Sequence, residues 1–357
     1  MNNQALKYLL FNIFLIAAFY VIGRLVLIAF RVKKLSMVHH TVAPVLGLST
    51  LALQLWLYGI INLPWTRLML FGPWLLTFVG VLVVYRRKRK QFLKPGAFKT
   101  LGKELDIFSR IILILCLIFV LAFWARMIFE PIMSADTLAF WAYKAKEFFI
   151  HQAVYVDPSL NTTVDIARFY HIDYPPLLPL MSDVAYVAVG YVHEVFLKSV
   201  NIVFVLSGAS CLFAFLKARL QKKETYKALV IAFLLVAAPQ FVPFLFQTKY
   251  MGFADYPLAI FMLLSTIFFV RSLFNSSYGD TILALFFASM AGVTKNEGLP
   301  FLVIILVLVV ARQFMISLEE KRLTHLLITC TIGLLALIPE IAWATYRLVH
   351  HIPVDFS

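Results

Sequence analysis

Long apolar runs alternate with short polar segments along the whole chain, and this alternation predicts a helical membrane protein. An apolar run of about 20 residues crosses the hydrocarbon core of a bilayer as an α-helix, because each residue adds ~1.5 Å. Ten runs are predicted to span, at residues 6–30, 41–62, 66–85, 107–129, 194–216, 227–247, 256–273, 280–294, 299–315 and 323–346. The predicted fold class is therefore all-α, a polytopic transmembrane bundle of about ten helices.

The composition agrees with this pattern, since 62% of the 357 residues are hydrophobic. The net charge of +14 does not indicate a nucleic-acid partner, because the cations lie in short segments between apolar runs and form no basic face on a soluble domain. Membrane lipids are the expected surroundings of most of the chain.

The cations are distributed unevenly between alternate loops, which predicts the orientation of the chain. Loops on the cytoplasmic side of a membrane carry the excess of Lys and Arg. The rich set holds Arg31, Lys33, Lys34, Arg86, Arg87, Lys88, Arg89, Lys90, Lys217, Arg219, Lys222, Lys223, Arg271, Arg312, Lys321 and Arg322. Three of the alternate loops hold far fewer, with Arg67, Lys249 and Lys295 each alone in its loop. Both termini and the polar segment 130–193 are therefore expected to face outward.

Residues 177–192 are apolar but are not counted as a span. The run is short, contains Pro179 and Asp183, and would place Arg219 outside if it crossed. We expect a helix that lies in the outer interface or is partly re-entrant.

Residues 137–149 are predicted to form an amphipathic helix on the outer membrane surface. Trp141, Ala145 and Phe148 share one face at helical spacing, and Lys144 flanks it. The aromatic rings are expected at the depth of the lipid headgroups.

Two acids follow or begin predicted helices on the outer side. Asp136 comes just after the span that ends at residue 129, and Asp255 begins the span after Lys249. Each acid is a good helix cap, and capping alone explains its presence. The functional interpretation makes Asp136 a general base that deprotonates an acceptor hydroxyl or amine. The two acids are compatible with a shared pocket.

Other polar side chains on the same side are candidates for substrate binding. Lys295 and Glu297 stand in a short turn between two apolar runs, where ionisable groups usually serve a site. The other candidates are Lys144, Lys146, Arg168 and Lys249 as phosphate-binding cations, and His171, Asp173 and Tyr174 before Pro175-Pro176. Lysines that extend from an interfacial helix toward water are the simpler interpretation for Lys144 or Lys146 alone. No cluster with metal-ligand spacing is present, so a divalent metal is not supported.

The order of these motifs resembles bacterial GT-C glycosyltransferases, in the branch of the protein O-mannosyltransferases and aminoarabinose transferases. The motifs are Asp136, then Trp141-x-x-Lys144-x-Lys146, then His171-x-Asp173-Tyr174-Pro-Pro, then Asp255-x-Pro257, then Thr294-Lys-Asn-Glu-Gly298. The resemblance covers about residues 107–346. It divides the chain into additional helices at 1–106 and a GT-C-like catalytic module at 107–357 with its outer loop at 130–193.

The resemblance implies an enzyme of the bacterial cytoplasmic membrane whose active site faces the periplasm. It would transfer a sugar, with inversion, from a polyprenyl-phosphate donor to a lipid, glycan or protein acceptor. Asp136 and Asp255 take the positions of the family's outer-loop acids, with Asp136 as the base, and no cofactor is implied. Family members usually continue beyond the position of Ser357, so the chain is expected to be a fragment or a minimal form.

Two other functions remain open from the sequence. A transporter or flippase for a polyprenyl-linked or other anionic lipid would carry ionisable or broken helices near the bilayer midplane. Arg24 and Glu340 are the main ionisable residues within the spans, and Pro239 and Pro243 interrupt one run. A non-catalytic assembly subunit is the third alternative, and in it Asp136 would be dispensable.

Overall fold

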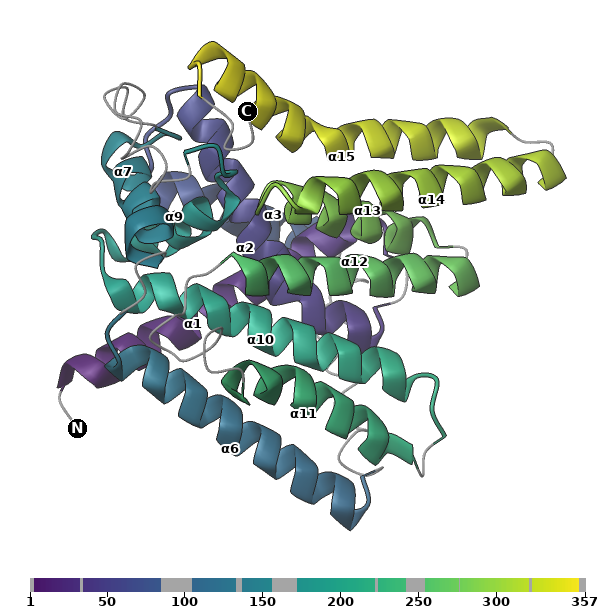
Figure 1. Cartoon of the computed structure of the whole chain (residues 1–357), viewed down its shortest axis with the longest axis horizontal. Helices are drawn as coiled ribbons and strands as arrows, with labels where there is room; N and C mark the ends of the chain where they lie inside the picture. The colour runs from purple at the N-terminus through teal and green to yellow at the C-terminus, as the bar shows by residue number, and fades with distance from the viewer. Residues whose placement is uncertain are drawn as a thin grey trace.

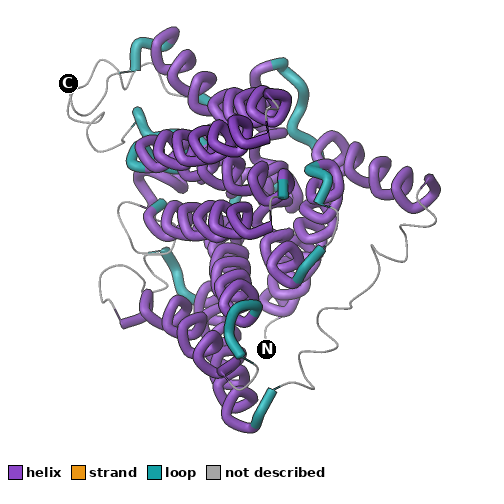
Figure 2. The backbone as a smooth tube through the Cα atoms, turned by 90° about the vertical axis from the view of Figure 1, so that its right-hand side faces the viewer, coloured by secondary structure: helices purple, strands orange, loops and turns teal. Residues whose placement is uncertain are grey.

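The computed structural model describes most of the chain as helices joined by loops (Figures 1 and 2). The described residues are 3–32, 35–84, 105–132, 137–155, 172–221, 224–241, 254–275, 277–320 and 323–352. No strand occurs among them. The prediction of an all-α fold is confirmed for this part of the chain.

Thirteen helical elements follow one another within the described residues, and most match the predicted runs. The elements are α1 (Asn3–Ala29), α2 (Met37–Ile60), α3 (Arg67–Val84), α6 (Ile107–Phe129), the π-helical turn η1 (Thr137–Ala142), α7 (Tyr143–His151), α9 (Leu177–Val189), α10 (Glu194–Lys217), α11 (Thr225–Phe241), α12 (Asp255–Asn275), α13 (Tyr278–Gly292), α14 (Gly298–Glu320) and α15 (Leu323–Val349).

Seven of these helices, α1, α2, α6, α10, α12, α14 and α15, are long and apolar enough to cross a membrane. The predicted spans at 66–85, 227–247 and 280–294 coincide with the shorter helices α3, α11 and α13. A helix of about 15 residues rises ~22 Å, which is less than the ~30 Å hydrocarbon core. The chain therefore has the architecture of a helical membrane protein, and the count of ten spans stays a prediction.

Consecutive helices from α12 to α15 pack against each other as antiparallel hairpins. The pairs α12–α13, α13–α14 and α14–α15 are each joined by a short connection and are in contact. The helix ends therefore gather at two ends of the bundle (Figure 1). One end holds α7, α9 and the first residues of α10, α12 and α14, and we call it the α7–α9 end. The opposite end is reached by α10 at Lys217 and by α12 near Arg271.

The first two helices cross so closely that two glycines are required. A Cβ atom on Gly23 would lie 1.8 Å from the carbonyl oxygen of Ala43, and one on Gly47 would lie 2.0 Å from that of Phe19. Small residues allow helix backbones in membranes to approach in this way. α2 also packs against α9 and α10, and one apolar core includes residues of α1, α2, α10, α12 and α13. The boundary at residue 106 stays a prediction, since both sides of it share this core.

The helix at 177–189 differs from an amphipathic surface helix. Every residue of α9 from Leu177 to Ala188 is buried, and the helix packs against α2, α7 and α10. It ends at Gly190, whose φ of +93° is a left-handed conformation that favours glycine. A helix that is buried on all sides is surrounded by protein rather than by lipid. The choice between an interfacial and a partly re-entrant position in the membrane stays a prediction.

The helix predicted at 137–149 is present as η1 and α7, but its environment is not the one expected. Trp141, Ala145 and Phe148 are buried, and α7 packs against α9. Lys144 is also buried, with 2% of its surface exposed, whereas Lys146 is exposed. The apolar face is covered by protein because α9 lies beside it, so Lys144 does not flank a membrane-facing surface.

Candidate functional site

A tight turn between α13 and α14 forms the centre of the candidate site. The turn is closed by backbone hydrogen bonds from Thr294 to Ala291 at 3.2 Å and from Gly298 to Lys295 at 2.8 Å. A Cβ on Gly298 would lie 2.0 Å from the carbonyl oxygen of Ala291, so only glycine fits there. Leu177, the first residue of α9, donates its backbone N–H to Val293 at 3.2 Å. The turn and α9 are therefore held together at the α7–α9 end.

Lys295 bridges two acids within this turn and the adjacent helix. Its Nζ lies 2.9 Å from Oδ1 of Asp255 and 3.1 Å from Oε1 of Glu297. Burial lowers the pKa of the Lys295 amine, but the hydrogen bonds and charges of Asp255 and Glu297 outweigh burial and hold this pKa above its ordinary value of 10.5. Lys295 is therefore cationic at neutral pH and is largely buried between carboxylates that remain partly exposed.

Asp173 joins the turn to two other elements. Its Oδ2 accepts a hydrogen bond from Nδ2 of Asn296 at 3.0 Å, and its backbone oxygen accepts one from Nε1 of Trp343 in α15 at 3.2 Å. Asp173 is buried, with 1% of its surface exposed. The segment before α9, the 293–297 turn and α15 therefore meet at this residue.

Tyr174 carries the connection onward to α7. Its ring stacks on Trp141 at 5.7 Å between centroids, and the amine of Lys295 lies 5.8 Å from its ring centroid. Nζ of Lys144 donates to the backbone oxygen of Tyr174 at 3.3 Å. Two cations and two aromatic rings are thus close together beside the carboxylates of Asp173, Asp255 and Glu297, an arrangement that suits a polar ligand.

The end of α6 and the two residues after Glu130 are held by the start of α10. The backbone N–H of Ile132 donates to Oε2 of Glu194 at 3.2 Å, and the amine of Lys198 donates to the backbone oxygen of Glu130. Lys198 is almost completely buried, with 1% exposed. The end of α6 is therefore anchored to α10 directly before residue 133.

The structure brings together six of the predicted site residues and leaves others unplaced. Lys144, Asp173, Tyr174, Asp255 and Lys295 are linked by the contacts above, with Glu297 bound to Lys295. Lys146 lies on the exposed face of α7 and has no contact with this group in the described part of the chain. Asp136, Arg168, His171 and Lys249 lie outside the described residues.

Two residues of this group, Asn296 and Trp343, and Lys198, which contacts the end of α6, were not predicted as site residues. Asn296 stands between two predicted residues, so its position in the turn was the available signal. Trp343 gave no such signal, because a Trp near the end of an apolar run is ordinary at a membrane boundary. Lys198 follows Glu194 by one helical turn, and this spacing alone does not indicate that its amine bonds to α6.

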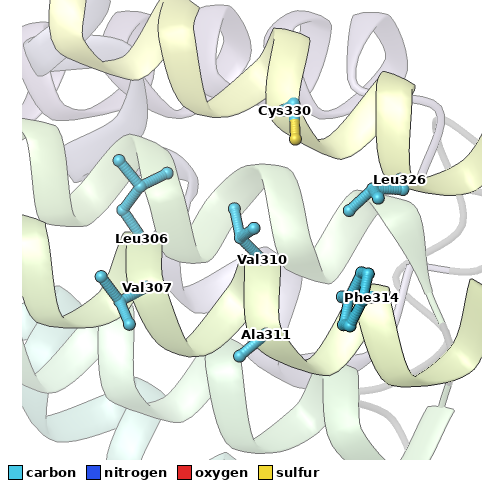
Figure 3. Close-up of a pocket in the computed structure, with 7 residues that line it drawn as sticks. All are labelled: Leu306, Val307, Val310, Ala311, Phe314, Leu326 and Cys330. Atoms are coloured by element: carbon cyan, nitrogen blue, oxygen red, sulfur yellow. The ribbon is translucent and has the colours of Figure 1, made fainter.

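An apolar groove runs between α14 and α15, away from the turn (Figure 3). Its cavity has a volume of about 490 Å³. The lining residues are Leu306, Val307, Val310, Ala311, Phe314, Leu326 and Cys330, none of them charged. Leu306 lies eight residues after Gly298, which corresponds to about 12 Å along α14. A hydrocarbon chain suits such a groove, because α14 and α15 expose mainly apolar side chains to their surroundings.

A second polar group is buried near the opposite end of the bundle, between α1, α2, α12 and α13. Nε2 of His39 lies 2.9 Å from Oδ1 of Asp280, and the guanidinium of Arg271 lies 3.5 Å from Oδ2 of the same carboxylate. Arg24 NH1 lies 2.9 Å from Nδ1 of His40. All five residues lie within about two turns of the ends of their helices.

The described residues contain no group of three or more His, Cys, Asp and Glu side chains placed to hold a metal ion. The absence of metal from the mechanism stays a prediction. No family model matches the chain, and no curated protein or solved structure shows significant similarity to it.

Proposed function

We propose that this protein is a membrane glycosyltransferase that moves a sugar from a polyprenyl-phosphate carrier to an acceptor at the non-cytoplasmic face. The observation that carries the proposal is the convergence of Lys144, Asp173, Tyr174, Asp255 and Lys295 at one end of an apolar helical bundle. Polar groups of both charges at the end of membrane-spanning helices suit a substrate with a polar head and an apolar tail.

In the proposed reaction, an acceptor hydroxyl or amine attacks the anomeric carbon of the donor sugar. The bond from that carbon to the phosphate oxygen breaks, polyprenyl phosphate leaves, and the proton of the acceptor passes to the carboxylate of Asp136. Lys295 and Lys144 supply positive charge toward the leaving phosphate. The acceptor is a lipid, a glycan or a protein, and the inversion at the anomeric carbon follows from a single displacement.

The apolar groove between α14 and α15 supports a lipid-linked donor. The same pair of helices borders the 293–297 turn at one end and the groove further along. A carrier whose phosphate lies near Lys295 would extend about 12 Å along α14 to reach Leu306. The carrier tail therefore has an apolar path beside the polar site.

The proposed orientation places the α7–α9 end toward the periplasm of a bacterium and the opposite end in the cytoplasm. The cation-rich positions Lys217, Arg219 and Arg271 lie at the opposite end, which is the side that the positive-inside rule assigns to the cytoplasm. The ten-span count and the outer position of α7 and α9 belong to this proposal.

The test is Asp136→Asn in membranes supplied with a radiolabelled polyprenyl-phosphate hexose. We expect transfer to fall by about 10² or more, because an amide does not accept the proton. Glu319→Gln, an exposed carboxylate near the far end of α14, is the control and should transfer normally. Wild-type transfer by Asp136→Asn at an equal protein level would refute the role of Asp136 as base.

A transporter or flippase for an anionic lipid is the second candidate, and the buried group around Asp280 favours it. Ionisable residues within membrane helices often mark a transport path. Here His39, Arg271 and Asp280 lie near helix ends rather than at the midplane where transporter sites are expected. The two functions are separated by measuring the flipping of a fluorescent polyprenyl phosphate in proteoliposomes that contain wild type, Asp280→Asn or Asp136→Asn. Flipping that depends on Asp280 and persists in Asp136→Asn would favour transport.

A further inference from the structure

Glu340 lies on the membrane-spanning part of α15, and one of its carboxylate oxygens has an unusual environment. Oε1 is buried and has no hydrogen-bond partner among the described residues. A Cβ on Gly292 would lie 1.9 Å from this oxygen, so the carboxylate occupies space that any other residue at position 292 would fill. A buried carboxylate oxygen without a donor costs free energy, which a bound ligand with a donor group would recover.

The position of Glu340 connects it to the candidate site. Gly292 is the last residue of α13, and the turn that carries Lys295 follows it directly. Trp343 is one turn after Glu340 on the same face of α15, and its Nε1 donates to the backbone oxygen of Asp173. The guanidinium of Arg347, one further turn along, lies 6.0 Å from the Trp343 ring centroid. One face of α15 thus carries an acid beside Gly292, an aromatic ring that contacts Asp173, and a cation beside that ring.

We propose that Glu340 is a sugar-binding residue, whose carboxylate accepts a hydrogen bond from a hydroxyl or amino group of the donor sugar. This inference rests on the proposed glycosyltransferase function and extends it to α15, which no predicted site residue occupies. Sugars carry several O–H donors, and a buried carboxylate is a strong acceptor for them. The residue as a whole is half-buried, so part of the side chain remains accessible. Gly292 makes the room that the carboxylate needs.

This role predicts opposite effects on stability and on binding. Replacing Glu340 with Leu removes an unpartnered polar oxygen from an apolar environment, so the folded state should be equally or more stable. The same replacement removes the acceptor for the sugar, so the sugar-loaded carrier should bind more weakly. A residue with only a structural role would not produce this combination.

The experiment uses the full chain in lipid nanodiscs with two probes, polyprenyl phosphate and polyprenyl-phosphate hexose in glucose and mannose forms. Binding and the melting temperature are measured for wild type, Glu340→Leu, Glu340→Gln and Gly292→Ala. The matched control is Glu319→Gln, an exposed carboxylate near the other end of α14. We expect Glu340→Leu to bind the hexose-loaded carrier about tenfold more weakly than wild type, with unchanged binding of the bare phosphate.

The remaining variants make the result specific to the carboxylate. Glu340→Gln should recover part of the binding because its amide oxygen still accepts, and Gly292→Ala should weaken binding because its methyl group displaces the carboxylate. Equal binding of the hexose-loaded carrier by wild type and Glu340→Leu would overturn the sugar-binding role while leaving the proposed function intact. A wild-type protein that neither prefers the hexose-loaded carrier nor transfers its sugar would overturn both.

Discussion

Lys295 shows how neighbouring charges decide the protonation of a residue at a membrane boundary. Burial of its amine favours the neutral form, whereas Asp255 and Glu297 lie within 2.9 and 3.1 Å and favour the cation. The carboxylates prevail, and the pKa of Lys295 lies above 10.5. The proposed role of Lys295 toward the leaving phosphate requires this charge, because a neutral amine does not attract a phosphate.

The raised pKa of Lys295 gives a prediction for stability against pH. Because the folded-state pKa exceeds the unfolded value of 10.5, the contribution of Lys295 is fully present below pH 10.5 and is lost as the pH rises through the raised pKa. We expect Lys295→Met to be less stable than wild type by an amount that is constant from pH 7 to about 10 and shrinks above 10.5. Thermal unfolding in detergent across this range measures it, and a difference that grows above pH 10.5 would contradict the assignment.

At the scale of helices, the pair α1–α2 and the pair α14–α15 pack in different ways. α1 and α2 approach until their backbones almost touch at Gly23 and Gly47, which fixes the first helices against the shared core. α14 and α15 instead leave a groove between them and expose most of their surface. We therefore expect substitutions in the first pair to change stability and substitutions in the second to change lipid binding.

Gly47→Ala should destabilise the protein by roughly 1–3 kcal/mol, because the added methyl group would lie 2.0 Å from the carbonyl oxygen of Phe19. Gly80→Ala in α3 is the control, since a Cβ there meets nothing within 4 Å. Alanine favours helix more than glycine does, so the control should be neutral or slightly stabilising. Melting temperatures in the same detergent compare the two, and equal values would argue against the close crossing.

Ala311→Trp should fill the groove between α14 and α15 and weaken binding of a polyprenyl phosphate. The indole would occupy part of the cavity of about 490 Å³ that Ala311 lines. Val303→Trp, at an exposed position of α14 outside the groove, controls for added bulk on the lipid-facing surface. Binding of a fluorescent polyprenyl phosphate in nanodiscs is the measurement. Equal affinity in both variants would exclude the groove as the site of the tail.

At the scale of the whole molecule, the two ends of the bundle differ in charge and composition. The α7–α9 end carries mixed charges and aromatic rings, whereas the other end carries the cations Lys217, Arg219 and Arg271, of which Arg271 lies beside Asp280. The short, buried α9 returns the chain to the end from which α10 begins, so later helices keep their orientation (Figure 1). The assignment of Lys217 and Arg219 to the cytoplasmic side depends on α9 beginning and ending at the same end of the bundle.

Single cysteines at positions 146 and 219 test the orientation, since both native side chains are exposed. The background replaces Cys116, Cys211 and Cys330, the three cysteines of the chain. A membrane-impermeant maleimide should label Lys146→Cys in intact spheroplasts and Arg219→Cys only after permeabilisation. Labelling of position 219 from outside would mean that residues 177–192 cross the membrane.

The sequence by itself determined the helical class, the long apolar helices and the alternation of basic loops, because run length and loop charge are local properties of a chain. It also predicted which polar residues to examine in the 293–297 turn. Tertiary structure decided the rest. Asp173 meets Asn296 and Trp343 across 123 and 170 positions, and Lys144 is buried because α9 packs beside α7. Such contacts depend on which helix faces meet. Hydrophobic periodicity does not specify which helix packs against a helix that is apolar on every side.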